Sequence, residues 1–175
     1  MSYHHGDLRR VLLDTALELI AERGPGAISL RDLARVAGVS HAAPAHHFGD
    51  KAGLFTAIAV QGNELLADAL AGADLEDMGV RYVRFAAEYP SHFEVMFRPD
   101  LWHTDDPDLA AARERTRAVL RERVPGNSDK IVLAAWSLAH GFATLRRAGN
   151  LDRLLADRDP GEEFRDIAGL LRVSP

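Results

Sequence analysis

The 175-residue sequence contains no cysteine. Disulfides, thiolate-ligated zinc sites and a cysteine nucleophile are therefore excluded, and the simplest expectation is a cytoplasmic protein. No apolar run approaches the roughly 20 residues that span a bilayer, so we expect no membrane insertion. The alternating pattern of half-buried strands is missing too, and so are internal repeats. These absences favour an all-helical globular chain.

Positive charge is also scarce. The chain has 21 Lys and Arg against 26 Asp and Glu, which gives a net charge of -5. Residues 1–60 carry equal numbers of basic and acidic residues, so the whole excess of negative charge lies in residues 61–175. Five of the eight histidines also lie within residues 1–60. Only this first third could therefore approach a polyanion such as DNA without strong repulsion.

Helical patterns occupy nearly the whole chain. Apolar residues recur at helical spacing, between good N-cap residues and glycine or proline stops, over residues 7–23, 30–37, 40–48, 50–72, 74–89, 91–97, 106–124, 128–149 and from 159 onward. The prediction is an all-α fold of about nine helices. We expect a DNA-binding domain over residues 1–50 and a second helical domain over residues 51–175.

Residues 30–48 fit a helix-turn-helix, because two short helical patterns flank a turn that contains Gly38. Helical hairpins with glycine turns also occur in ordinary bundles, so this pattern alone leaves a bundle open. Ser29 is predicted to cap the first of these helices and Ser40 the second. With Ser40 as the cap, Pro44 would be the fourth helical residue and would forfeit the first intrahelical hydrogen bond.

The segment from Ser128 to Gly149 is apolar on most of its circumference. The residues concerned are Ile131, Val132, Leu133, Trp136, Leu138, Phe142 and Leu145. A helix that is apolar all round must be covered on all sides, and in a protein of this size a second subunit is the expected cover.

Two groups of stretches resemble the TetR family of bacterial transcriptional regulators. AERGPGAISLRDLARVAGVS and HHFGDKAGLFTAI resemble its DNA-binding domain. YHHGDLR, YVRFAAEYPSHFEVMFRP and AWSLAHGFATL resemble a subgroup with a Trp-His-Gly signature, here Trp136, His140 and Gly141. The resemblance covers most of the chain, least distinctively in 98–127 and 150–175. It implies a homodimer: three N-terminal helices bind DNA, about six more bind a ligand, and the last two build an intersubunit four-helix bundle.

The helix that would read DNA departs from the family pattern. Relatives commonly have tyrosine where this chain has Ala45, so one phosphate contact is expected to be lost. A helix this short presents its first residues to the major groove. The resemblance also implies that His47 faces a phosphate. Histidines 46 and 47 could instead be surface residues without a role, and Phe48 is expected in the core.

The expected DNA contacts fall into two classes. His41, Ala42, Ala45 and His46 would face base edges. Lys51, Ser29 and Arg31 stand at helix starts, where phosphates are favoured. The whole predicted set is Ser29, Arg31, Ser40, His41, Ala42, Ala45, His46, His47 and Lys51.

A small-molecule site should be concave and mostly apolar. The predicted lining consists of Met78, Tyr82, Phe85, Phe93, Met96, Phe97, Trp102, His103, Leu120, Trp136 and His140. Methionine and aromatic residues at helical spacing also form ordinary hydrophobic cores, so a core that binds no ligand remains the alternative. His140 could contact a ligand or be a core histidine satisfied by a neighbour. If a ligand binds, this lining favours an apolar or aromatic compound.

Enzyme motifs are missing: there is no Glu-x-x-His pair, phosphate loop or Gly-x-Ser-x-Gly. We therefore expect no enzyme, no cofactor and no metal site. The expected function is that of a transcriptional repressor on a palindromic double-stranded DNA operator, relieved by a small apolar or aromatic ligand. The alternative is a dimeric helical scaffold or ligand-binding protein with weak or no DNA binding, which Ala45 and the histidine-rich helix keep open.

Overall fold

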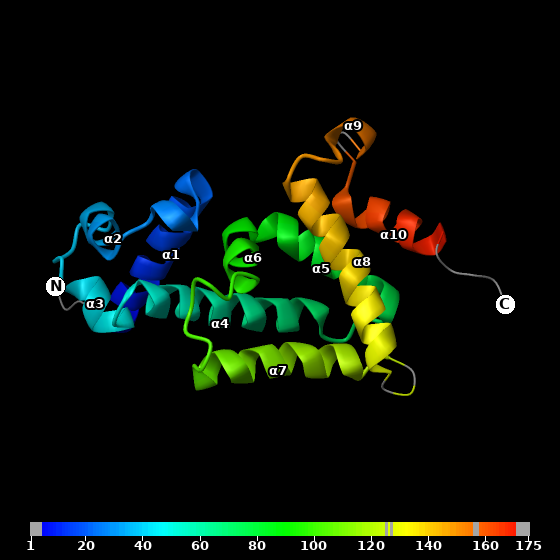
Figure 1. Cartoon of the computed structure of the whole chain (residues 1–175), viewed down its shortest axis with the longest axis horizontal. Helices are drawn as coiled ribbons and strands as arrows, with labels where there is room; N and C mark the ends of the chain where they lie inside the picture. Colours follow the sequence, from blue (N-terminus) through cyan, green and yellow to red (C-terminus); the bar gives the residue numbers. More distant parts are fainter. Residues whose placement is uncertain (1–4, 125, 127, 156–157, 171–175) are drawn as a thin grey trace. The chain divides into compact units, whose positions relative to one another are not determined.

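The computed structural model describes residues 5–124, 126, 128–155 and 158–170, and all regular structure within them is helical (Figure 1). The predicted all-α class is therefore confirmed. The elements are α1 His5–Arg23, the 3-10 turn η1 Pro25–Ala27, α2 Leu30–Val36, α3 Ala43–Phe48, α4 Lys51–Leu70, α5 Leu75–Glu88, α6 Pro90–Met96, α7 Pro107–Arg121, α8 Asp129–Arg147, α9 Asp152–Leu155 and α10 Pro160–Leu170. Tyr3 and His4 of the YHHGDLR stretch lie outside the described residues.

Within the described ranges there are ten α-helices, one more than the sequence pattern predicts, and eight of them have seven or more residues. The additional helix is the four-residue α9. A single turn of helix shows no apolar periodicity, because periodicity needs at least two turns to appear. This is why the pattern search passed over it.

The helices form two compact units. The N-terminal unit combines the chain up to Asn63 with the segment Pro90–Ala112, and the C-terminal unit combines Glu64–Tyr89 with the chain from Arg113 onward. Helices α4 and α7 therefore each contribute residues to both units. The division into domains at residue 50 stays a prediction.

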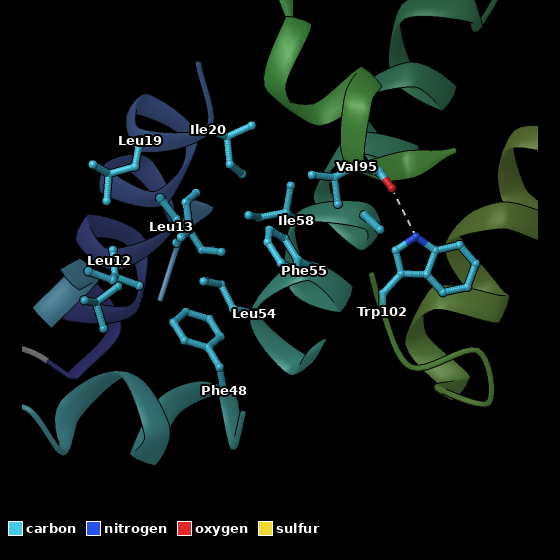
Figure 2. Close-up of a cluster of buried hydrophobic side chains, with 14 of the residues drawn as sticks. Leu12, Leu13, Leu19, Ile20, Phe48, Leu54, Phe55, Ile58, Val95 and Trp102 are labelled. Atoms are coloured by element: carbon cyan, nitrogen blue, oxygen red, sulfur yellow. Dashed lines mark hydrogen bonds between the residues drawn. The ribbon is translucent and has the colours of Figure 1, made fainter. Parts of the chain in front are cut away.

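The core of the N-terminal unit is built between α1 and α4. Figure 2 shows Leu13 of α1 directed toward Phe55 and Ile58 of α4. The buried residues of each helix recur at three- and four-residue spacing and so form one apolar face: Leu12, Leu13, Ala16, Leu19 and Ile20 on α1, and Leu54, Phe55, Ile58 and Ala59 on α4. Phe48, at the end of α3, joins the same cluster and is 9% exposed, so its predicted core position is confirmed.

Most helix starts have the predicted caps. The Ser29 Oγ accepts the Asp32 N–H at 3.1 Å, as expected of an N-cap. Asp50 caps α4 in the same way, with its Oδ1 accepting the Gly53 N–H at 2.7 Å. Such caps satisfy backbone donors that the first helical turn leaves without a partner. Side-chain caps at the first turn are thus readable from the sequence.

The predicted start of the second helix of the helix-turn-helix is wrong. Helix α3 begins at Ala43, and Ser40 instead accepts the Ala43 N–H on its carbonyl at 3.0 Å, closing a turn. Pro44 is therefore the second helical residue and forfeits no intrahelical hydrogen bond. The physical reason is that proline lacks an N–H and fits the first turn, where that N–H would have no helical acceptor.

In the C-terminal unit, α5 packs against both α8 and α10. Two glycines allow the close approach of α10. A Cβ on Gly79 would lie 2.4 Å from the Phe164 ring, and one on Gly161 would lie 2.8 Å from Val80 Cγ1. Glycine at these two positions therefore lets α10 lie directly on α5.

Helix α8 is only partly covered within one chain. Its buried residues are Ala139, Phe142 and Ala143. Leu133 and Leu145 remain 58% and 47% exposed, and Ile131 and Trp136 are exposed as well. Apolar side chains in this number on one helix indicate a surface that another element covers.

Candidate nucleic-acid interface and ligand cavity

The predicted DNA-contacting residues all reach the surface of the N-terminal unit. Ser29, Arg31, Ser40, His41, Ala42, Ala45 and His46 are exposed, whereas His47 and Lys51 are half-buried. His41 and Ala42 lie in the turn before α3 and not in its first turn. The structure thus groups the set around α2, the turn and α3.

Helix α3 is short because it is bounded on both sides. Pro44 fits its first turn, and Gly49 ends it with a φ of 76°, a conformation that favours glycine. The Gly49 N–H donates to the Ala45 carbonyl at 2.8 Å. Beside the helix, the Arg9 guanidinium lies 5.4 Å from the centre of the Phe48 ring. The helix is therefore anchored at its C-terminal end.

Few positive charges lie on this surface, and one of them, on Lys51, is already used in a contact within the protein. The Lys51 Nζ donates to the Gly26 carbonyl at 3.1 Å and lies 5.6 Å from the centre of the Phe55 ring. Lys51 therefore holds the η1 turn to the start of α4. Arg31, on the first turn of α2, is fully at the surface.

A cavity of about 260 Å³ lies in the C-terminal unit. It is lined by Leu70, Leu75, Glu76, Met78, Gly79, Tyr82, Leu120, Ala135, Trp136, Leu138, Ala139, Phe164, Ala168 and Gly169. Four of the predicted ligand-site residues are among them: Met78, Tyr82, Leu120 and Trp136. The lining is almost entirely apolar, which suits an apolar or aromatic molecule.

Tyr82 and Trp136 of the lining are hydrogen-bonded in a chain with His140, a predicted lining residue that does not itself line the cavity. The Trp136 Nε1–H can only donate, so it donates to the Tyr82 hydroxyl oxygen at 3.3 Å. The Tyr82 hydroxyl also shares a hydrogen bond of 2.8 Å with His140 Nδ1. Burial lowers the pKa of His140, and burial raises the pKa of the Tyr82 phenol above its ordinary value. The His140 Nδ1 therefore has a neighbouring side chain, Tyr82, as its hydrogen-bond partner.

The other predicted lining residues lie elsewhere. Phe85 is buried in the C-terminal unit and stacks on Tyr89 at 5.2 Å between ring centres. Phe93, Met96, Phe97, Trp102 and His103 belong to the N-terminal unit. Within that unit the Phe93 and Phe97 rings pack edge to face at 5.1 Å. The predicted set thus combined aromatic residues from two separate cores.

The sequence prediction missed the small residues of the cavity, above all Gly79, Ala135 and Ala168. A signal existed for Gly79, which lies four residues after Leu75 and three before Tyr82, on the apolar face of α5. Ala168 gave no such signal, because alanine occurs throughout this chain. Small residues create a cavity by what they leave empty, and a search for large apolar side chains passes over them.

In the described part of the chain, no group of three or more histidine and carboxylate side chains could hold a metal ion. None of its helices has both the length and the apolar composition for crossing a membrane.

Comparisons with known proteins extend these observations. Residues 12–58 match the family model for bacterial regulatory proteins of the tetR family, and residues 75–168 match that for the tetracyclin repressor-like C-terminal domain. The HTH-type transcriptional repressor Rv3405c of Mycobacterium tuberculosis is 33% identical over 78 residues, 45% of this chain and 33% of that protein. The matched region thus spans about a third of the length of this curated relative.

Two solved structures are similar over nearly the whole chain. A protein of unknown function from Rhodococcus sp. RHA1 is 31% identical with a TM-score of 0.78, covering 96% of this chain and 94% of that one. A tetR-family transcriptional regulator from Streptomyces coelicolor shares the fold at 22% identity with a TM-score of 0.67, covering 95% and 78%. Since the C-terminal family model alone matches more than half of the chain, and the helix-turn-helix model matches its N-terminal part, the chain belongs to the TetR family of bacterial transcriptional regulators.

Proposed function

We propose that this TetR-family regulator is a repressor that binds a palindromic DNA operator as a homodimer in the cytoplasm and is released by a small apolar or aromatic ligand. The observation that carries the proposal is the helix-turn-helix, of whose nine proposed contact residues seven are exposed and two, His47 and Lys51, are half-buried. As a member of this family the chain is a regulator and not an enzyme. We further propose that it belongs to the subgroup with the Trp-His-Gly signature.

The proposed DNA contacts divide by position. Ala45 and His46 on α3 would meet base edges, together with His41 and Ala42 in the preceding turn. Helix N-termini and exposed cations favour phosphate, which supports Ser29, Arg31 and Lys51 as positioning contacts. Ser40 and His47 complete the set. Residues 1–50 would form the DNA-binding domain and 51–175 the ligand-binding and dimerising domain.

The proposed dimer forms through α8 and α10. Ile131, Leu133, Trp136 and Leu145 leave α8 with an exposed apolar surface, and Leu170 near the end of α10 is exposed too. A homodimer interface is more apolar than the rest of a protein surface. These residues therefore support α8 and α10 as the faces that two copies share.

The proposed effector binds in the cavity beside Tyr82 and Trp136. The chain holds two tryptophans, so Trp102→Phe leaves Trp136 as the only tryptophan whose emission reports on the cavity. A neutral two-ring aromatic compound should quench the Trp136 emission saturably and lower operator affinity. Ala168→Phe, which fills the cavity, should weaken this quenching about tenfold or more, whereas Ala111→Phe at an exposed site should not. Quenching that is insensitive to Ala168→Phe would place the compound elsewhere.

A gel shift tests the proposal itself. The full-length protein is mixed with the intergenic DNA beside its own gene, with unrelated DNA of equal length as competitor. A specific operator should be retarded at a protein concentration on the order of 10 nM. The alternative, a helical scaffold without DNA binding, gives no specific shift. An Arg31→Ala variant should weaken the shift and reduce its salt dependence, because one phosphate contact is removed.

A further inference from the structure

The loop between α6 and α7, residues 97–106, is part of the N-terminal unit. Its Trp102 is 7% exposed and belongs to the same buried cluster as Phe48 and Leu54. The Trp102 Nε1–H donates to the Val95 carbonyl at 3.1 Å, as Figure 2 shows. A buried tryptophan with its donor satisfied holds a loop firmly in place. The 97–106 loop is therefore fixed to the core behind the reading helix α3.

The next residue, His103, attaches this loop to α4 at two points. The His103 backbone N–H donates to Thr56 Oγ1 at 3.0 Å. The His103 Nε2 lies 3.1 Å from Asp50 Oδ1. A carboxylate can only accept, so the imidazole donates. The hydrogen bond from the Gly53 N–H, and then that from His103, lower the pKa of Asp50.

Asp50 stands at the joint between the reading helix and α4. Only Gly49 and Asp50 separate α3 from α4. The Asp50 N–H donates to the Phe48 carbonyl at 3.0 Å, and a Cβ on Gly53 would collide with that same oxygen. The end of α3 and the start of α4 therefore touch through their backbones. A group that fixes Asp50 also fixes the C-terminal end of α3.

We propose that His103 is a positioning residue for the reading helix: through its hydrogen bond to Asp50 it holds the α3–α4 joint, and it makes the 97–106 loop a point from which structural changes reach α3. The inference rests on the proposed function only for its effect on operator binding. The hold on α3 itself exists in the free protein.

Hydrogen exchange of the free, full-length protein tests this hold without DNA. The His46 and Gly49 amides close the α3 hydrogen bonds, to Ala42 and Ala45. In His103→Leu they should exchange about two- to fivefold faster, the range expected when the interaction between two side chains exposed to this degree is lost. His103→Gln, which keeps a donor, should restore much of the protection, while α1 amides stay unchanged. Equal protection in wild type and His103→Leu would overturn the inference.

A second arm separates the capping role of Asp50 from its contact with His103. Serine is a good N-cap, so Asp50→Ser retains the cap of α4 while its side chain is too short to reach the imidazole. Asp50→Ser and His103→Leu should each lower operator affinity about two- to fivefold, and the double variant should lose no more than either single one. Fully additive losses would overturn the coupling. Because the exchange arm needs no operator, its result stands apart from that of the gel shift.

Discussion

Imidazole and methyl groups dominate the surface that we propose to read DNA. His46 lies on α3 and is exposed, and its neighbour Ala45 is exposed as well. A histidine donates or accepts a single hydrogen bond at a base edge, unlike the bidentate grip of arginine or asparagine. Specificity at this position should therefore be real but modest.

His46→Ala should lower operator affinity about two- to tenfold, the range for one net hydrogen bond. Fluorescence anisotropy with single-base variants of the operator should show a relaxed preference at one base pair. Arg153→Ala, on α9 in the C-terminal unit, serves as the control and should leave affinity unchanged. If the loss is equal on every operator variant, His46 contacts phosphate and not a base.

His140 should make stability depend on pH. Its pKa is lowered by burial, so above about pH 6.5 the folded and unfolded states both hold a neutral imidazole. Below that pH the unfolded chain takes up a proton that the folded state resists. The free energy of unfolding should therefore fall as the pH drops from 7 to 5.

Chemical denaturation at both pH values measures this effect. His140→Asn should show a smaller loss between pH 7 and pH 5 than the wild type. Burial also lowers the pKa of His92, so part of the loss should remain in that variant and shrink in His92→Asn. An unchanged pH dependence in His140→Asn would contradict the role assigned to this burial.

At the scale of elements, the sequence predicted the side-chain caps of most helices but not the start of α3. Ser29, Asp50, Asp74, Asp106 and Asp159 cap their helices through side-chain oxygens. Each cap is a local hydrogen bond that follows from residue type and position. Ser40 has the same chemistry, yet α3 starts at Ala43 because Pro44 fits the first turn. The capping preference of Ser40 and the first-turn preference of Pro44 favour different helix starts, and the helix has the start that suits the proline.

The α3–α4 joint should be intolerant of any side chain at Gly53. In Gly53→Ala the new methyl group would collide with the Phe48 carbonyl, so α3 or α4 must shift. The free energy of unfolding should fall by about 2 kcal/mol, a typical cost of overpacking. Denaturant unfolding measures this, with Gly26→Ala as the control because no atom lies near its Cβ position. Equal stability of both variants would mean that the joint relaxes freely.

At the scale of the whole molecule, the exposed apolar residues of α8 support the proposed contact with a second copy of the chain. Leu133 and Leu145 are each about half-exposed, although every turn of α8 carries apolar residues. The sequence predicted this need from the apolar circumference alone. Which residues stay uncovered was decided by the packing of α5 against α8.

The double variant Leu133→Glu, Leu145→Glu should be monomeric in analytical ultracentrifugation and should bind the operator at least tenfold more weakly. Charges on an apolar interface oppose association, and a monomer contacts only one half-site. Val11→Glu, an exposed position on α1 in the other unit, should stay dimeric. A dimer that persists in the double variant would move the interface away from this part of α8.

The sequence by itself determined the helical class, most helix boundaries and the family, because periodicity, caps and short motifs are local properties of the chain. Tertiary structure decided which aromatic residues lie together in one core or around one cavity. Trp102 and His103 were predicted beside Trp136, yet the fold places Trp102 in the core of the N-terminal unit, His103 at the surface of that unit and Trp136 at the cavity. Burial and cavity formation depend on residues distant in sequence, and a one-dimensional pattern does not record which of those residues meet.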